Sequence, residues 1–284
     1  MLISMKEAYA YAEQNECGLA AVNTPFFELL LAAIDVGEET NTPIILSFAQ
    51  SHEKYVGIDE IGPAMVTLAE RSSAPFVVHV DHGEDIDYIA RGLDMGFNSC
   101  MIDGSLLPFE DNVEVTSRVV QMAHERGVAV EGEIGAMSGN ENGDPSQGLA
   151  DASLYTTPEE AAEFVRRTGV DSLAASFGTV HGLYRQKPNL DYGLIAELRN
   201  AAGVPLVMHG GSGLSIKEYR ETIKQGVRKV NYYTYAAKAA LEAVRPLAAD
   251  DETFVFSDLA ARAREAVRED IFAFSAALNQ TLAR

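Results

Sequence analysis

Three short segments place a histidine where an apolar run of the sequence ends. They read HVDHG, GTVHG and HGGSG, and they supply His82, His181 and His209. Three neutral imidazoles suit a catalytic zinc ion whose fourth coordination position stays open for water or substrate. The sequence therefore predicts one catalytic zinc site built from these three histidines.

The segment HGGSG also has the composition of an anion-binding loop. Gly210, Gly211 and Gly213 permit backbone conformations in which several N–H groups converge on one anion, and Ser212 adds a hydroxyl donor. The run NYYT at 231–234 ends the last predicted strand. In barrels of alternating strands and helices, phosphate sites are frequently made by the loops after strands seven and eight. We therefore expect a phosphate site beside the metal.

Other polar side chains fall at or near the ends of predicted strands. Asp81 precedes the first of the histidines, where a carboxylate can shuttle protons or merely orient an imidazole. Asp103 and Glu133 end two further strands, where a structural role and ligation of an alternative metal position are both open; we favour metal-linked roles for both. His52 follows the second strand, where a substrate-binding role and plain solvation are both open. For His79, inside its strand, helix-side packing or a hydrogen bond near the ligands is expected rather than ligation.

Eight short apolar runs alternate with helical patterns after an opening helix at Met5–Gln14, and a final helix is expected at about Asp258–Leu282. Short apolar runs are typical of strands buried on both faces of a parallel sheet. Eight strand–helix pairs without a compositional break predict a single α/β domain over residues 1–284. Its expected architecture is a (β/α)8 TIM barrel with an N-terminal helix and an extra C-terminal helix. The predicted strands are Leu19–Val22, Ile44–Phe48, Phe76–Val80, Ser99–Ile102, Val128–Ile134, Ser172–Ser176, Leu206–Met208 and Lys229–Asn231.

A doubly wound open sheet is the alternative architecture. It would more naturally show a glycine-rich turn after the first strand, and residues 23–28 read NTPFFE instead. The longest stretch without periodicity is Gly135–Thr157, whose length favours a functional loop over an ordinary connection.

The chain is strongly acidic, with 22 Lys and Arg against 42 Asp and Glu and a net charge of −20. Such a chain repels nucleic acid and anionic membranes, so we expect neither as a partner. Its two cysteines, Cys17 and Cys100, match no metal-ligand spacing and suggest a reducing compartment. We find no signal-peptide pattern and no apolar run near the ~20 residues that span a membrane. A cytoplasmic protein is expected.

The combination of motifs resembles the class II, zinc-dependent ketose-bisphosphate aldolases, which act on fructose or tagatose bisphosphate. The resemblance covers nearly the whole chain. It is carried by HVDHG, MIDGSLLPFE at 101–110, VEGEIG at 130–135, YTTPEEAAEFVRRTGVDSLAASFGTVHGLY at 155–184, HGGSG and KVN at 229–231.

The resemblance implies a role for each matching residue. His82, His181 and His209 match the zinc ligands, and Asp81 matches the acid/base aspartate. Glu141 matches the glutamate that moves the proton at the α-carbon of the ketone. The implied reaction is reversible cleavage of a ketose phosphate or bisphosphate to dihydroxyacetone phosphate and an aldehyde, through an enediolate that zinc stabilises as a Lewis acid.

The resemblance also implies further ligands. Asp103 and Glu133 match carboxylates at a second or alternative metal position, and a monovalent cation, Na⁺ or K⁺, often accompanies the phosphate site. The expected partner is a small sugar phosphate, and the expected assembly is a homodimer or homotetramer. The residues that match the dihydroxyacetone phosphate site are Gly182, Gly210, Gly211, Ser212, Asn231, Tyr232, Tyr233 and Thr234.

The residues for the aldehyde half depart from the family pattern. After strand eight the family usually has an acid and, two positions on, a basic residue, where this chain has Tyr235 and Ala237. A serine usual after strand two aligns with Ala49. Because that basic residue helps to bind the aldehyde's phosphate, its absence predicts an aldehyde other than glyceraldehyde 3-phosphate, unphosphorylated or recognised through His52 and the tyrosines. Lys238 is one position off, which turns it ~100° around a helix.

Two other classes of function compete with that of an aldolase. A metal-dependent hydrolase or isomerase on the same barrel usually starts with an HxH pair on strand one, where residues 18–23 read GLAAVN. A non-catalytic sugar-phosphate sensor is favoured by loss of Asp81 or Glu141, and both are present.

Overall fold

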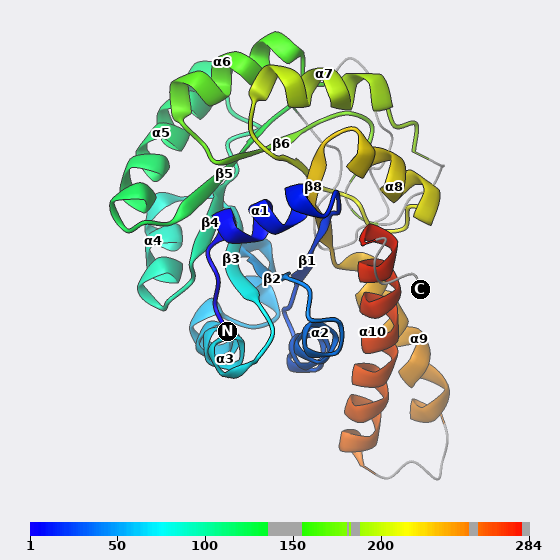
Figure 1. The fold of residues 1–284 in the computed structure, drawn as a ribbon. Coiled ribbons are helices and arrows are strands. Elements are labelled where there is room, and N and C mark those ends of the chain that lie inside the picture. The colour runs from blue at the N-terminus through cyan, green and yellow to red at the C-terminus, as the bar shows by residue number, and fades with distance from the viewer. Residues whose placement is uncertain (136–154, 181, 183–187, 250–254, 280–284) are drawn as a thin grey trace.

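The structure is a computed structural model, and it describes residues 1–135, 155–180, 182, 188–249 and 255–279. Within these residues eight parallel strands form a closed barrel in the order β1 to β8 (Figure 1). Ala20 of β1 pairs with Ile44 of β2 on one side and with Val230 of β8 on the other, which closes the sheet. The predicted (β/α)8 barrel is confirmed. The strands are β1 (Leu19–Asn23), β2 (Ile44–Ala49), β3 (Phe76–Gly83), β4 (Ser99–Ile102), β5 (Ala129–Ile134), β6 (Ser172–Ala175), β7 (Leu206–Met208) and β8 (Val227–Tyr232).

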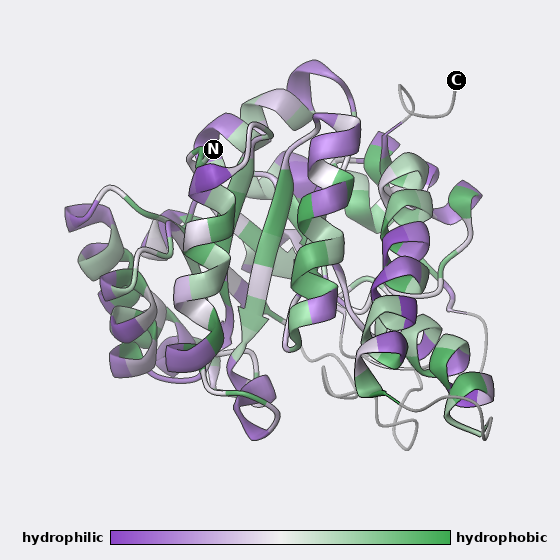
Figure 2. Cartoon of the chain, turned by 90° about the horizontal axis from the view of Figure 1, so that it is seen from below, coloured by the Kyte–Doolittle hydropathy of each residue, from purple (hydrophilic) through white to green (hydrophobic). Residues whose placement is uncertain are grey.

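Helices surround the barrel, and their residues facing the strands are buried and apolar. Figure 2 shows apolar residues along the strands and mixed hydropathy on the helices around them. No helix among the described residues is both long and apolar enough to cross a membrane. The helices are α1 (Met5–Gln14), α2 (Phe27–Thr40), the short 3-10 helix η1 (Gln50–Lys54), α3 (Ile58–Arg71), α4 (Ile86–Asp94), α5 (Phe109–Glu125), α6 (Pro158–Thr168), α7 (Tyr192–Ala202), α8 (Ile216–Lys224), α9 (Thr234–Ala248) and α10 (Phe256–Leu278).

The barrel interior is apolar toward the N-terminal ends of the strands and polar toward their carboxyl ends. On β3 the inward residues alternate as Val77, His79 and Asp81, whereas Val78 and Val80 join the core under the helices. Helix α1 lies across the N-terminal end of the barrel (Figure 1) and covers the apolar part. The polar side chains of the interior therefore lie toward the carboxyl ends of the strands. The apolar cluster under α1 contains Met5, Ala8, Tyr9, Ala12, Leu19, Ala21, Ile45, Val77 and Ala129.

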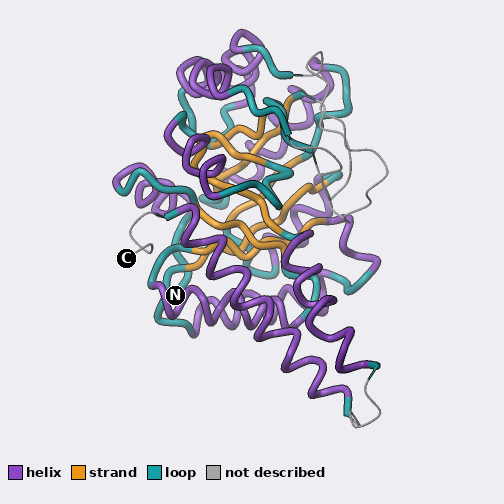
Figure 3. Tube along the Cα trace, turned by 90° about the vertical axis from the view of Figure 1, so that its right-hand side faces the viewer, coloured by secondary structure: helices purple, strands orange, loops and turns teal. Residues whose placement is uncertain are grey.

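Helices α9 and α10 form an antiparallel pair that extends beyond the barrel (Figure 3). Helix α10 also packs on α2, where Arg264 makes a two-pronged ion pair with Asp35 and Arg268 pairs with Glu39. The expected C-terminal helix begins two residues earlier than predicted and ends at Leu278, not at position 282.

Candidate metal and active site

The carboxyl end of β3 presents two consecutive polar side chains to the barrel interior. Along a regular strand Asp81 and His82 would face opposite sides. Here His82 has a φ of 42°, in the left-handed region, and the pairing of β3 with β4 shifts register between Val80 and Gly83. This backbone turn brings both side chains to one face. Glycine is required next, because a Cβ at position 83 would lie 2.8 Å from the carbonyl oxygen of Met101.

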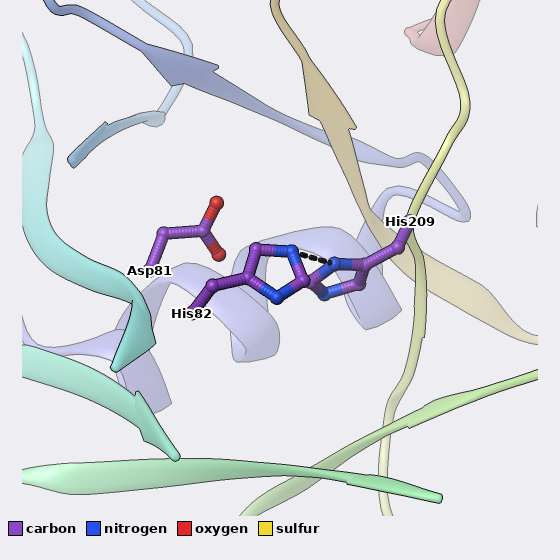
Figure 4. A group of neighbouring side chains, drawn as sticks. All are labelled: Asp81, His82 and His209. Atoms are coloured by element: carbon purple, nitrogen blue, oxygen red, sulfur yellow. Dashed lines mark hydrogen bonds between the residues drawn. The ribbon is translucent and has the colours of Figure 1, made fainter. Parts of the chain in front are cut away.

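His82 meets His209, the first residue after β7, with the two rings nearly perpendicular (Figure 4). Nε2 of His82 lies 2.8 Å from Nδ1 of His209. The outer nitrogens each lie 2.8 Å from a carboxylate oxygen, His82 Nδ1 from Asp103 and His209 Nε2 from Glu131. Because an ionised carboxylate only accepts, the outer nitrogens carry the hydrogens and the inner nitrogens turn lone pairs toward each other. Both inner nitrogens are then available as donors to one divalent cation, and imidazole donors suit zinc.

Glu133 adds a buried carboxylate to the same place. Its Oε2 has no hydrogen-bond partner among the described residues and lies 3.9 Å from Nδ1 of both His82 and His209. Burial, and then the charge of Asp103, raises the pKa of Glu133 well above its usual range. Burial would also raise the pKa of Asp103, but hydrogen bonds from His82 and Ser105 lower it overall. His82, Asp103 and Glu133 offer ligand atoms within 4.8 Å of one another, as a second metal position requires.

Asp81 is fully buried and is held by two asparagine amides. Nδ2 of Asn23 donates to Oδ2 of Asp81 over 2.7 Å, and Nδ2 of Asn231 lies 3.0 and 3.1 Å from the two carboxylate oxygens. Asp81, His82 and His209 also offer ligand atoms within 4.8 Å of one another. The carboxylate is therefore fixed beside the metal donors, where it can either handle a proton or complete the coordination.

Sequence reasoning missed two residues of this site, Glu131 and Lys229. Oε1 of Glu131 accepts from His209, and Oε2 accepts from Nζ of Lys229 over 2.8 Å. Burial alone would raise the pKa of Glu131, but Lys229 and His209 lower it overall. A signal was present in the sequence. Glu131 precedes Glu133 by two residues and Lys229 precedes Asn231 by two, so strand alternation places each beside a predicted site residue.

His79 faces the barrel interior and not the helices. Its Nδ1 lies 2.8 Å from Oγ of Ser99, and its Nε2 lies 3.4 Å from Nζ of Lys229 and 3.7 Å from Asp81. Burial, and then the nearby Lys229, lowers the pKa of His79 to about 3, so the imidazole is neutral. Helix-side packing of His79 was therefore a wrong expectation, because strand alternation sends Val80 outward. The alternative, hydrogen bonding near the ligand residues, is what the structure has.

The HGGSG loop follows β7 along a tight path. Gly210 and Gly213 have φ values of 61° and 88°, in the region that favours glycine. A Cβ at Gly211 would lie 2.5 Å from a side-chain atom of β8. Oγ of Ser212 accepts the N–H of Tyr233 over 3.2 Å. The two segments predicted to bind phosphate are therefore in direct contact.

The helices after these two loops differ at their N-termini. Helix α8 is capped internally, because Ser215 and Glu218 form a capping box that uses its first N–H groups. Helix α9 begins at Thr234, and its N-cap residue Tyr233 makes no side-chain cap hydrogen bond. The backbone N–H groups of α9, close to Ser212, are the better donors for an anion.

Tyr232 directs its side chain away from this site. Its hydroxyl donates to Asp270 over 2.8 Å, and its ring stacks on Phe274 of α10 with the centroids 4.0 Å apart. Asn231 is the inward residue, so the backbone of Tyr232 is the part that can serve the predicted phosphate site.

His52 lies on η1 and is fully buried among aromatic rings. Its ring centroid is 4.4 Å from that of Tyr233, 5.9 Å from Tyr55 and 6.3 Å from Phe48. Plain solvation of His52 was therefore a wrong expectation, because η1 folds the side chain under Tyr233. The contact with Tyr233 joins His52 to the predicted phosphate loops.

Three predicted residues lie in or beside the segments after β5 and β6. Glu141 and His181 are outside the described residues. Gly182 is described, is buried, and has a φ of 86°, in the left-handed region.

Residues 3–280 match the family described as "Fructose-bisphosphate aldolase class-II". The chain belongs to the class II fructose-bisphosphate aldolase family. The fructose-bisphosphate aldolase of Staphylococcus epidermidis is 35% identical over 274 residues, which cover 95% of this chain and 94% of that protein. The probable fructose-bisphosphate aldolase of Bacillus subtilis is also 35% identical, with 95% of each chain covered.

Solved structures of aldolases have the same fold. The YdjI aldolase of Escherichia coli K12 matches with a TM-score of 0.87 and 32% identity, over 98% of this chain and 97% of that one. A putative fructose-1,6-bisphosphate aldolase of Coccidioides immitis matches with a TM-score of 0.86 and 26% identity, over 98% of each chain. The protein is therefore a class II aldolase, an aldehyde-lyase of a zinc-dependent family that acts on sugar phosphates. The hydrolase, isomerase and sensor alternatives are set aside.

Proposed function

We propose that this aldolase binds its zinc ion through His82, His181 and His209 and uses Asp81 and Glu141 to move protons. The observation that carries this assignment is the convergence of Asp81, His82 and His209 within 4.8 Å. Bound zinc supplies Lewis-acid polarisation of the ketone carbonyl. A second or alternative metal position would use Asp103 and Glu133. The buried Oε2 of Glu133, which has no hydrogen-bond partner among the described residues, supports this position.

Asp81 is the group we assign to the C4 hydroxyl. In cleavage it takes the hydroxyl proton as the C3–C4 bond breaks, and in condensation it returns that proton. The amides of Asn23 and Asn231 hold the carboxylate in place, so its position does not depend on bound substrate. Glu141 is assigned to the α-carbon, where it delivers the proton in cleavage and removes it in condensation. Glu141→Ala should slow exchange of the α-proton of dihydroxyacetone phosphate, and an unchanged exchange rate would remove this assignment.

The phosphate of dihydroxyacetone phosphate is assigned to Gly182, to Gly210–Ser212 and to Asn231–Thr234. The Ser212–Tyr233 hydrogen bond joins the two loops and leaves the hydrogen of the Ser212 hydroxyl for the ligand. The N-terminus of α9 adds backbone donors. Such local donors are what an acidic enzyme needs to bind an anionic substrate. A Na⁺ or K⁺ ion is proposed to accompany this site.

The aldehyde is proposed to differ from glyceraldehyde 3-phosphate. Ala237 stands where a basic residue is usual, and Nζ of the neighbouring Lys238 lies 5.6 Å above the Tyr235 ring and 3.6 Å from Glu242. Lys238 thus has its partners, Tyr235 and Glu242, on its own helix. The aromatic group around His52, which contacts Tyr233, is the part we assign to recognition of a neutral aldehyde.

A comparison of aldehydes tests this assignment. We expect kcat/KM for condensation with dihydroxyacetone phosphate to be higher for unphosphorylated aldehydes than for glyceraldehyde 3-phosphate. The absent charge-assisted hydrogen bond to phosphate is equivalent to ~1.5–3 kcal/mol, or about one to two orders of magnitude in binding. Ala237→Arg should improve glyceraldehyde 3-phosphate selectively. A strong wild-type preference for glyceraldehyde 3-phosphate would refute the assignment.

We also propose that the chain is one domain over residues 1–284, that it assembles as a homodimer or homotetramer and that it works in the cytoplasm. Its two cysteines are buried free thiols, which agrees with a reducing compartment. Sedimentation of the zinc-loaded enzyme gives the subunit number directly.

A further inference from the structure

Glu131 and Lys229 form a buried ion pair that the reaction steps do not use. Lys229 has no exposed surface and Glu131 is 2% exposed. Each oxygen of Glu131 has a different partner, because Oε1 accepts from Nε2 of His209 and Oε2 accepts from Nζ of Lys229, both over 2.8 Å. The carboxylate therefore connects a zinc-ligand histidine to a buried cation.

Lys229 is itself held from more than one side. Its Nζ lies 3.4 Å from Nε2 of His79, whose Nδ1 lies 2.8 Å from Oγ of Ser99. It also lies 4.0 Å from Oδ1 of Asp81. The direct contact of Lys229 with Glu131, at 2.8 Å, leaves this carboxylate little freedom to turn away from His209. Ser99 lies further out in the network and contacts His79, not Glu131 or Lys229.

The second ligand histidine is supported in a different way. Asp103, the partner of His82, has a side chain that is 25% exposed, and its other oxygen accepts from Ser105. Water can therefore stabilise the charge of Asp103. Glu131 is sealed from water, and a buried carboxylate requires a compensating cation, which only Lys229 provides among the described residues within hydrogen-bond reach.

We propose that Glu131 and Lys229 act as one positioning unit for His209. Glu131 takes the Nε2 hydrogen, Lys229 fixes the other oxygen of Glu131, and Nδ1 of His209 is thereby the nitrogen presented to zinc. Groups that hydrogen-bond the far nitrogen of a ligand histidine fix its tautomer and ring orientation. This role rests on the zinc site proposed above, and its tests measure the metal and the imidazole, not only turnover.

The first test uses the unmodified enzyme. Long-range ¹H–¹⁵N correlation spectra of histidine-labelled, zinc-loaded protein report which nitrogen of His209 carries hydrogen. We expect hydrogen on Nε2 and zinc on Nδ1. Hydrogen on Nδ1 would overturn the proposal whatever the variants do.

The second test measures zinc affinity by competition with a chromogenic chelator in Glu131→Gln, Lys229→Met and the double variant. We expect each single change to weaken zinc binding about tenfold to a hundredfold. If the pair acts as a unit, the double variant binds zinc no more weakly than the worse single variant. Ser99→Ala is the matched control, since it alters the same buried network without touching either oxygen of Glu131, and it should bind zinc as the wild type does.

Cobalt substitution separates positioning from general loss of structure. Folded Glu131→Gln loaded with Co²⁺ should show an altered visible ligand-field spectrum, and Ser99→Ala should not. Wild-type affinity and spectrum in both single variants would refute the proposal, and so would additive losses in the double variant. Either result would leave the aldolase assignment intact, because that assignment fails only if zinc-dependent release of dihydroxyacetone phosphate is absent.

Discussion

Replacement of Asp81 separates the carbon–carbon bond step from metal binding. Asp81→Ala removes a fully buried carboxylate that accepts from Asn23 and Asn231 over 2.7 to 3.1 Å. A positioned acid/base group contributes about 10²- to 10⁴-fold to rate. At 1.36 kcal/mol per tenfold, that is a barrier increase of ~2.7–5.4 kcal/mol. We therefore expect cleavage of the ketose phosphate to fall by that factor.

The same substitution should leave the metal in place. The imidazoles of His82 and His209 keep their own partners, Asp103 and Glu131, when Asp81 is absent. The amides of the two asparagines lose their acceptor, at a cost of ~1–3 kcal/mol for each buried donor that water cannot reach. Folding of the variant is checked by its melting temperature.

Three measurements on one preparation decide the outcome: zinc content, cleavage rate, and exchange of the α-proton of dihydroxyacetone phosphate with deuterated water. We expect normal zinc, slow cleavage and retained exchange. Asp85→Asn is the control. Asp85 also follows β3, but its carboxylate accepts the backbone N–H of Tyr88 and caps the N-terminus of α4. Loss of zinc in Asp81→Ala would make Asp81 a ligand, and near-normal cleavage would exclude it as the acid/base group.

Three further predictions follow from other parts of the molecule. The purified enzyme should hold about one zinc ion per subunit, and exhaustive chelation should abolish cleavage until zinc is restored; full activity after chelation would contradict the zinc assignment. Gly37→Ala should lower the free energy of unfolding by ~1–3 kcal/mol, because its Cβ would lie 2.3 Å from Cζ of Phe76, whereas Gly193→Ala in α7 should be neutral or stabilising. Burial raises the pKa of Asp270 in the fold despite the hydrogen bond from Tyr232. The folded state therefore binds more protons than the unfolded state between the ordinary and the raised pKa, and stability falls as pH rises through that window. Asp270→Asn should remove this fall in stability. The melting temperature of the variant minus that of the wild type should therefore be larger at pH 7 than at pH 3, and an equal difference at both pH values would contradict the prediction.

The sequence predicted the barrel because strands buried on both faces leave short apolar runs at regular spacing. It also predicted His82 and His209, since residues at the ends of parallel strands meet on one rim. It could not predict that Asp81 and His82 share a face, because that depends on the left-handed backbone at His82. Glu131 was overlooked because a single charge inside an apolar run carries no spacing signal until its partner across the barrel is known.

The outward orientation of the Tyr232 side chain is another feature that the sequence did not predict. A run of four residues predicted a common phosphate role, but strand alternation divides the run between two faces. Asn231 bonds to Asp81 inside the barrel, and Tyr232 stacks on Phe274 outside it. Whether a helix such as α10 covers the outer face is a tertiary property, and the local pattern does not contain it.

Several polar contacts inside this barrel join strands that are not neighbours in the sheet. His82 of β3 meets His209 after β7, on the opposite wall, and Asp81 of β3 bonds to Asn231 of β8. A half-barrel of β1–β4 would carry one part of the metal site and a half-barrel of β5–β8 the other. Zinc should therefore act as a crosslink between the two halves of the chain, and its binding energy adds to the stability of the closed barrel by mass action. Separately expressed halves of this enzyme would associate more tightly with zinc than without it, and the metal would report on barrel closure as well as on catalysis.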